Sequence, residues 1–209
     1  MKICYISNSA APSKNASSLQ TSKLCEGLSK QGNNVLLILP NTGDTKKNYF
    51  NFYNIRSRFK ITRIKFFKKF PTGIYYYLYS IISILKSNFR KQDLYITRNF
   101  FTSLLLCILK KKHILEVHDD ILIEGRVVQF LIRYLRMLNF KQVVKIITTT
   151  YSLKKRYIEY GVKKNKIFVL HNASSLTPFF KKSKKKKKLN IGYFGSLFKS
   201  RGVELILDL

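Results

Sequence analysis

Short apolar runs alternate along the chain with longer segments in which apolar positions recur at helical spacing. The run Val35–Leu39 is continuous and is bounded by polar residues and a proline, which is typical of a strand buried on both faces of a parallel sheet. The segment Ser17–Lys30 carries leucines near helical spacing, and Gly32 stands where a glycine commonly ends a helix. This part of the chain therefore predicts a helix followed by a buried strand.

The same alternation continues to residue 170. We predict strands within 2–9 and at 35–39, 59–67, 93–97, 113–117, 143–148 and 166–170. We predict helices at 17–30, 74–87, 100–109, 124–140 and 153–160, the last of them ending at Gly161. Strands and helices that alternate at this spacing indicate a doubly wound α/β fold with a parallel sheet. We place this domain at residues 1–175.

The end of the chain repeats the pattern once more. Lys181–Lys188 holds seven lysines in eight positions, a run that repels itself, so we expect residues 176–188 to form a basic, Lys-rich linker. A strand at 189–194, a turn, and a helix opening at Arg201 follow before the chain stops at Leu209. We expect residues 189–209 to be the first βα unit of a second, truncated α/β domain.

The chain is strongly basic, with forty Lys and Arg against ten Asp and Glu and a formal net charge of +30. Such a surface attracts phosphates, nucleic acid or anionic lipid headgroups. Residues 45–92 hold twelve Lys and Arg and no acid, and the basic and aromatic residues interleaved at 59–70 would suit either RNA or an anionic membrane. No zinc finger, RNP1, KH or double-stranded RNA pattern is present, so nucleic acid is the less favoured partner.

Several classes of protein are excluded by composition. At 45% hydrophobic residues the chain is too apolar for intrinsic disorder. Its three cysteines form no CxxC pattern, which argues against a disulfide scaffold or zinc module and favours a reducing cytoplasm. The first residues do not form a signal peptide, and the most apolar stretch, Ile74–Leu85, is too short to span a bilayer.

Candidate chemistry follows from the rule that open α/β sheets bind ligands outside the carboxyl ends of their strands. The polar residues at such positions are Ser7, Asn8, Ser9, the loop Ser13–Ser18, Thr97, Arg98, Asn99, His118, Asp119, Asp120, His171 and Asn172. We expect them to face one cleft. His118 is the main functional candidate because it follows a buried strand and precedes two acids, whereas His113 opens that strand and is expected to be structural.

Two of these positions have alternative interpretations. The segment Asn15–Ser18 is a helix N-cap, an anion site built on the free amides of that helix, or both. Arg98 either pairs with Glu116 or Asp93, or binds an anion.

His118-Asp119-Asp120 is not expected to hold a metal, because adjacent residues on a turn rarely converge on one ion. No GxSxG elbow, Walker lysine or GxGxxG loop is present.

Five segments together resemble the family 4 glycosyltransferases of the GT-B fold. They are KICYISNSAAPSKNASSLQTSKLCEGLSKQGNNVLLILP, DLYITRN, ILEVHDD, IITTTYSLKKRYIEYGVKKNKIFVLHNA and GYFGSLFKSRGVELIL, in the order and spacing of that family. The resemblance covers nearly the whole chain. It implies a Rossmann-like N-terminal, acceptor-side domain followed by the start of a donor-binding domain.

The resemblance also implies an activity and a set of site residues. The activity would be retaining, metal-independent transfer of a sugar from a nucleotide-sugar, with no further cofactor. His118 matches the family's histidine near the transferred sugar, and Asn15, Ala16 and Ser17 match its loop near acceptor and donor phosphates. Arg201 matches the cation that contacts the donor pyrophosphate. Arg98 and Asp119 are expected to be supporting polar residues.

The sequence departs from the family pattern at several points. Ala16-Ser17 replaces paired glycines, Ser196 stands where many members have arginine, and Ala173 replaces a glycine. The family's glutamate pair for the nucleotide and donor sugar would lie beyond Leu209, so we expect this chain alone to lack most of the donor pocket and to be inactive.

Three hypotheses remain. The first is the acceptor-side part of a glycosyltransferase that acts on a surface polysaccharide or glycolipid at the cytoplasmic face of an anionic membrane, which residues 45–92 would meet. The second is a non-catalytic basic α/β module that binds nucleic acid or anionic lipid. The third is a degenerate gene product without activity.

Overall fold

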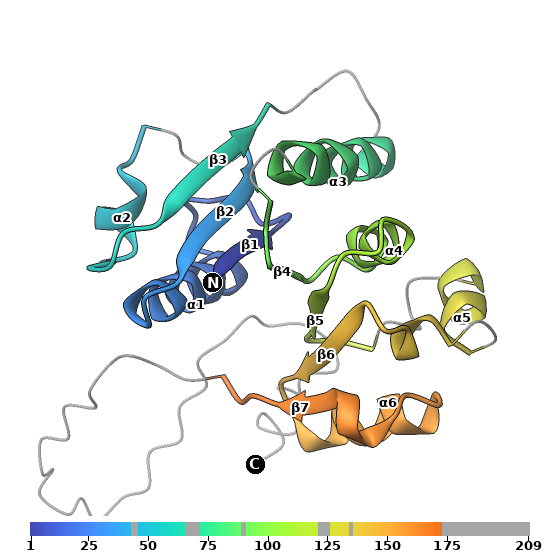
Figure 1. Cartoon of the computed structure of the whole chain (residues 1–209). Coiled ribbons are helices and arrows are strands. Elements are labelled where there is room, and N and C mark those ends of the chain that lie inside the picture. Colours follow the sequence, from blue (N-terminus) through green and yellow to red (C-terminus); the bar gives the residue numbers. More distant parts are fainter. Residues whose placement is uncertain (43–45, 66–71, 89–90, 121–125, 134–135, 173–209) are drawn as a thin grey trace, which may run out of the picture. The chain divides into compact units, whose positions relative to one another are not determined.

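The computed structural model describes residues 1–42, 46–65, 72–88, 91–120, 126–133 and 136–172 (Figure 1). Residues 1–172 form one compact unit. The predictions of a linker at 176–188 and of a βα unit at 189–209 fall outside the described residues, as does Arg201.

The described residues form one seven-stranded, all-parallel sheet. Its strands are β1 (Lys2–Ile6), β2 (Asn34–Pro40), β3 (Lys60–Ile64), β4 (Leu94–Thr97), β5 (His113–Val117), β6 (Val143–Thr148) and β7 (Ile167–Val169). The order across the sheet is β3-β2-β1-β4-β5-β6-β7, so its direction of winding reverses between β1 and β4. This is the doubly wound α/β fold that the sequence predicts, and the reversal is the place where such sheets bind ligands.

Helices cover the two faces of the sheet (Figure 1). They are α1 (Ala16–Lys30), α2 (Tyr49–Phe52), α3 (Thr72–Asn88), α4 (Phe100–Ile108), α5 (Arg126–Arg133) and α6 (Tyr151–Glu159). Alternate residues of β1 face opposite sides of the sheet and belong to different core clusters. Ile3 and Tyr5 pack with α1 and α2, whereas Cys4 and Ile6 pack with α3 and α4. A further cluster joins α4, α5 and α6 to β5, β6 and β7.

Most predicted elements are confirmed. The strands at 113–117 and 143–148 have the predicted bounds, and α1 begins one residue before the predicted start. Gly32 and Gly161 follow α1 and α6 with φ of 80° and 84°, left-handed values that favour glycine and let the chain leave the helix. The predicted strand 59–67 is shorter in the structure, where β3 ends at Ile64, and residues 66–71 lie outside the described part.

The single helix predicted for 124–140 is wrong. The helix α5 ends at Arg133, Arg136 adopts a left-handed φ of 48°, and Met137–Asn139 forms a separate 3₁₀ turn. Met137 and Leu138 are both buried in the core there. The side chain of Asn139 donates to the carbonyl of Gly161 and accepts from the amide of Lys163, which ties this turn to the loop after α6.

The helix α2 was not predicted. Its N-cap is Asn48, whose side chain accepts hydrogen bonds from the amides of Phe50 and Asn51. Tyr49 and Tyr53 are buried in edge-to-face contacts with neighbouring rings. An asparagine before a run of aromatic residues was the signal, but one turn of helix is too short to show periodicity.

None of the described helices is long and apolar enough to cross a membrane. The apolar stretch Ile74–Leu85 lies in α3.

Candidate functional site

A cavity of about 730 Å³ opens at the carboxyl edge of the sheet, next to the reversal between β1 and β4. Its lining residues are Ala16, Ser17, Gln20, Arg98, Glu116, Val117, His118, Asp119, Asp120 and Asn172. They come from the start of α1, the residue after β4, the end of β5 with its following turn, and the segment after β7. The structure thus brings together seven of the residues expected at this edge: Ala16, Ser17, Arg98, His118, Asp119, Asp120 and Asn172.

The buried carboxylate of Glu116 is the centre of the polar network. It lies on β5 and is only 4% exposed. Its Oε2 accepts a hydrogen bond of 2.7 Å from the hydroxyl of Tyr5, and its Oε1 lies 2.8 Å from Nη2 of Arg98 and 2.9 Å from Nε2 of His118. One carboxylate therefore holds groups from β1, the end of β4 and the turn after β5.

This network keeps Glu116 ionised. Burial alone would raise the pKa of the carboxyl, but the hydrogen bonds from His118 and Arg98, together with the arginine's charge, lower that pKa to about 2. Burial and the same carboxylate raise the pKa of Tyr5 well above its usual value, so the Tyr5 hydroxyl stays a donor. An ionised carboxylate can only accept hydrogen bonds.

The acceptor-only carboxylate fixes the tautomer of His118. Because Glu116 cannot donate, the 2.9 Å contact requires a proton on Nε2 of His118. The neutral ring then has Nδ1 as its acceptor, and Nδ1 makes no hydrogen bond within the described part of the chain. His118 lines the cavity with its side chain 25% exposed. It can therefore accept a hydrogen bond or a proton from a ligand hydroxyl there.

Arg98 makes the ion pair with Glu116 and not the one with Asp93, whose carboxylate accepts from the amide of Lys2. Its Nη1 also lies 3.4 Å from the carbonyl of Ser17 at the start of α1. Arg98 borders both the main cavity and a second one of about 250 Å³, lined also by Ser7, Asn8, Ser9 and Asn99. The ion pair leaves the guanidinium at the wall of both cavities, where it can meet an anion.

The start of α1 supplies a second attraction for anions. Asn15 takes the N-cap position with an extended backbone, but its side chain caps no amide. Ala16 and Ser17, in the first turn, line the cavity, whereas Asn15 does not. The positive end of the helix dipole and a nearby guanidinium together favour a phosphate. The N-cap interpretation holds for the position of Asn15, and the anion-site interpretation agrees with this geometry.

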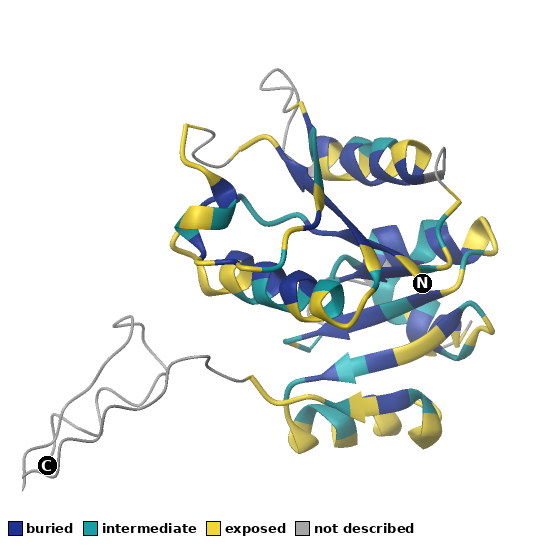
Figure 2. Ribbon diagram, turned by 60° about the vertical axis from the view of Figure 1, so that its left-hand side comes forward, coloured by how far each residue is buried: buried dark blue, intermediate teal, exposed yellow. Residues whose placement is uncertain are grey.

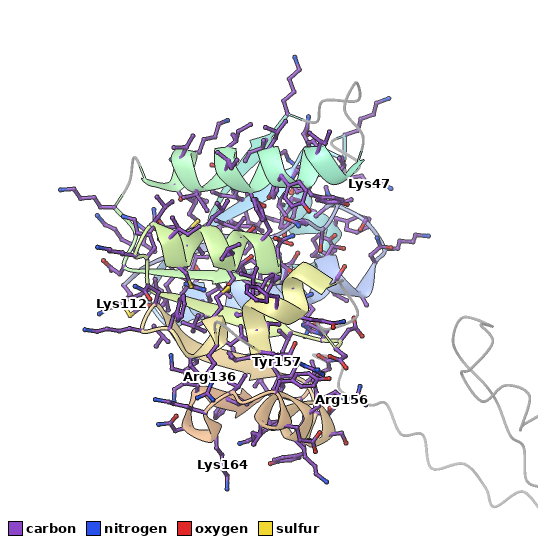
Figure 3. The ribbon with its side chains drawn as sticks, turned by 90° about the vertical axis from the view of Figure 1, so that its right-hand side faces the viewer. Lys47, Lys112, Arg136, Arg156, Tyr157 and Lys164 are labelled. Carbon is purple, nitrogen blue, oxygen red and sulfur yellow. The ribbon has the colours of Figure 1, made fainter. Side chains whose placement is uncertain are left out.

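The two aspartates after His118 have different surroundings. Asp119 is exposed at the cavity wall. Asp120 accepts hydrogen bonds from the hydroxyl of Tyr160 at 2.7 Å and from Nη1 of Arg156 at 2.9 Å, which fastens the turn to α6; Arg156 is labelled in Figure 3. Among the described residues, no group of three His, Cys, Asp or Glu side chains is arranged to hold a metal ion.

The other histidines lie outside the cavity. His113 is fully buried at the opposite end of β5, between the hydroxyl of Ser103 and the carbonyl of Lys111, which agrees with a structural role. His171 is exposed and bonds the carbonyl of Thr149. Asn172 does reach the cavity, where its side-chain oxygen accepts from Gln20 at 2.6 Å.

Sequence reasoning missed two contributors to the site, and it treated Glu116 only as an ion-pair partner. Gln20 lies four residues after Ala16, one helical turn along α1, so helical spacing from the predicted loop would have found it. Tyr5 gave no such signal, because a tyrosine inside an apolar strand is usually a core residue.

Comparison with known proteins gives a family. The family model described as Glycosyltransferase Family 4 matches residues 20–176. No curated protein matches the chain in sequence.

Solved structures share the fold at low sequence identity. Anabaena HepE in complex with UDP and glucose is 13% identical, with a TM-score of 0.58 over 83% of this chain and 45% of that one. The lipopolysaccharide outer core galactosyltransferase WaaB is 10% identical, with a TM-score of 0.56 over 85% and 47%. The UDP-GlcNAc 2-epimerase of Neisseria meningitidis is 12% identical, with a TM-score of 0.55 over 81% and 45%. This chain spans less than half the length of each.

Proposed function

The chain belongs to glycosyltransferase family 4, and from that premise we propose that it forms the acceptor-side half of an enzyme that transfers a sugar from a nucleotide-sugar donor. One observation carries the proposal. The cavity at the reversal of the sheet combines an anion-attracting helix start, a guanidinium and a histidine of fixed tautomer within one wall. Transfer from a nucleotide-sugar needs both functions, because phosphate charge develops while a hydroxyl attacks the sugar.

Each side chain then has a role. Arg98 and the amides at the start of α1 offset the negative charge of a phosphate. His118 accepts a hydrogen bond from a sugar or acceptor hydroxyl through Nδ1, and Glu116 holds that ring in place. Asp119, exposed at the wall, is available to a second hydroxyl. Arg201 would contact the donor pyrophosphate, as the family resemblance implies.

The fold alone does not separate sugar transfer from sugar epimerisation, because a UDP-GlcNAc 2-epimerase is among the similar structures. The family match favours transfer. Since the structures of HepE hold UDP and UDP-glucose, UDP-sugars are the donors to try first. We further propose retention of anomeric configuration and no requirement for a metal or other cofactor. The anomer of the product and the activity after chelation would test these two points.

The proposed acceptor is a surface polysaccharide or a glycolipid, met at the cytoplasmic face of an anionic membrane. The excess of cations over residues 45–92 supports this location. Nucleic acid is not proposed as a partner. The non-catalytic basic module remains the competing hypothesis, and it predicts membrane or polyanion binding without turnover.

The test is a screen of the full-length protein with nucleotide-sugars, with and without glycolipid acceptors. Release of free nucleotide that increases when an acceptor is added supports the transferase. Conversion of the donor sugar into its epimer, with the nucleotide still attached, would favour an epimerase. No reaction with any donor would favour the non-catalytic module.

A further inference from the structure

The helix α3 packs on the core through Tyr75, Tyr79 and Ile84 together with buried serines, and a second apolar face of the helix points outward. Ser80, Ser83 and Ser87 are all completely buried. Ser80 accepts a hydrogen bond from Thr102 of α4, while Ser83 and Ser87 donate to carbonyls of their own helix. These small, hydrogen-bonded side chains let α3 pack closely against its neighbours.

The outward side is a continuous apolar stripe of Ile74, Tyr77, Ile81 and Leu85. These positions are spaced by three or four residues, so they share one face of the helix. Their exposed fractions are 49%, 52%, 41% and 55%. Figure 2 shows exposed residues, in yellow, recurring along α3. Scattered single apolar residues are ordinary on a surface, but a stripe along a whole helix indicates a binding surface.

Exposed cations lie at the C-terminal end of α3 and in the segment after α4. Lys86 is exposed in the last turn of α3, and Lys91 is exposed just after the helix. Lys110 and Lys112 are exposed just after α4, which packs beside α3 (Figure 3 labels Lys112). Between residues 45 and 115 the sequence contains a single acid, Asp93, and the amide of Lys2 bonds its carboxylate.

This combination favours a bilayer over a protein partner. An apolar stripe on a helix with lysines close to its end is an arrangement by which interfacial helices lie in the plane of an anionic membrane. The ring of Tyr77, still half exposed although it contacts Phe101, has the amphipathic character found at the level of the headgroups.

We propose that the outward stripe of α3 is a docking surface for an anionic lipid bilayer, with the helix lying flat in the headgroup region. The lysines after α3 and α4 would contact anionic headgroups, while Ile74, Ile81 and Leu85 reach the acyl boundary. The outward stripe of α3 would then be the surface by which the protein reaches the membrane proposed above. It does not depend on sugar transfer, so a failed docking test and a failed activity screen are separate results.

The test measures binding of the full chain to mixed phosphatidylglycerol–phosphatidylcholine vesicles and to pure phosphatidylcholine vesicles. The variants are Leu85→Gln and the pair Ile81→Gln with Leu85→Gln. Each lost aliphatic side chain should weaken binding to the mixed vesicles about tenfold, and pure phosphatidylcholine should bind far less.

The matched control is Leu19→Gln. Leu19 is 46% exposed on α1, on the opposite face of the sheet, so this change should leave binding as in the wild type. Equal weakening by Leu19→Gln, or unchanged binding by the α3 variants, would overturn the proposal in favour of general attraction to the cationic chain. A wild-type dimer that the double variant converts to a monomer would also overturn it, because a second copy would then cover the stripe.

Discussion

Three donors converge on the carboxylate of Glu116, and this contact decides what the neighbouring side chains can do. Tyr5, Arg98 and His118 all donate to it at 2.7–2.9 Å. A carboxylate that is ionised and nearly buried cannot reorient its charge, so it fixes both the arginine and the histidine. At the scale of residues, the chemistry of the cleft therefore depends on Glu116, which is only 4% exposed. We expect it to act by holding Arg98 and His118 in place.

The tautomer of His118 is the first consequence to test. In nitrogen NMR of the full chain, the neutral form of His118 should carry its proton on Nε2 and none on Nδ1, because Nε2 donates to an acceptor-only carboxylate. The Glu116→Gln variant replaces that carboxylate with an amide that can also donate, so it should give a mixture of tautomers. His171 is the internal control and should not change. A neutral ring with its proton on Nδ1 in the wild type would contradict the proposed role.

Stability in acid is the second consequence. The pKa of Glu116 is about 2 in the folded chain, below its ordinary value of 4.5. A lowered carboxyl pKa stabilises the fold above the ordinary value, and that stabilisation is lost as pH falls from 4.5 toward about 2. The contribution is about 3 kcal/mol. Denaturation across this range should show a steeper loss for the wild type than for Glu116→Gln, and parallel curves would contradict the assignment.

At the scale of elements, local sequence signals predicted where most strands and helices form but not every place where a helix ends. The buried strands and the glycine-terminated helices followed from apolar runs and from Gly32 and Gly161. The break before Met137 could not be predicted, because it depends on burying that turn against the core and on Asn139 bonding to the loop after α6. Such contacts bridge segments about one helix and one strand apart, where periodicity carries no information.

Two glycines test this account with the same substitution. Gly161 has a φ of 84°, so Gly161→Ala should destabilise the fold by about 1 kcal/mol. Gly27 lies inside α1 with no atom within 4 Å of an added Cβ, so Gly27→Ala should stabilise it by about 0.5–1 kcal/mol. Chemical denaturation of both variants gives the sign of each change in the free energy of unfolding. The same sign for both would contradict the assigned backbone geometry.

At the scale of the whole molecule, topology brings the site together. The rule that ligands bind at the carboxyl edge of an open sheet was enough to predict that Arg98, His118 and the start of the first helix share a cleft. It could not predict the contact between Tyr5 and Glu116, which lie 111 residues apart and join through the register of β1, β4 and β5. Nor could it predict that Ile81 and Leu85 of α3 lie outward while Ile84 is buried, since a helical period alone does not say which of two apolar faces packs on the sheet.

The central proposal is that a sugar is transferred in this cleft, and one comparison of rates tests it most directly. In the full-length protein, with the best donor and acceptor from the screen, His118→Ala should lower kcat by about a hundredfold or more. His171→Ala, which changes a histidine at the same edge that does not line the cavity, should leave kcat near the wild-type value. Equal rates for the two variants would contradict the claim.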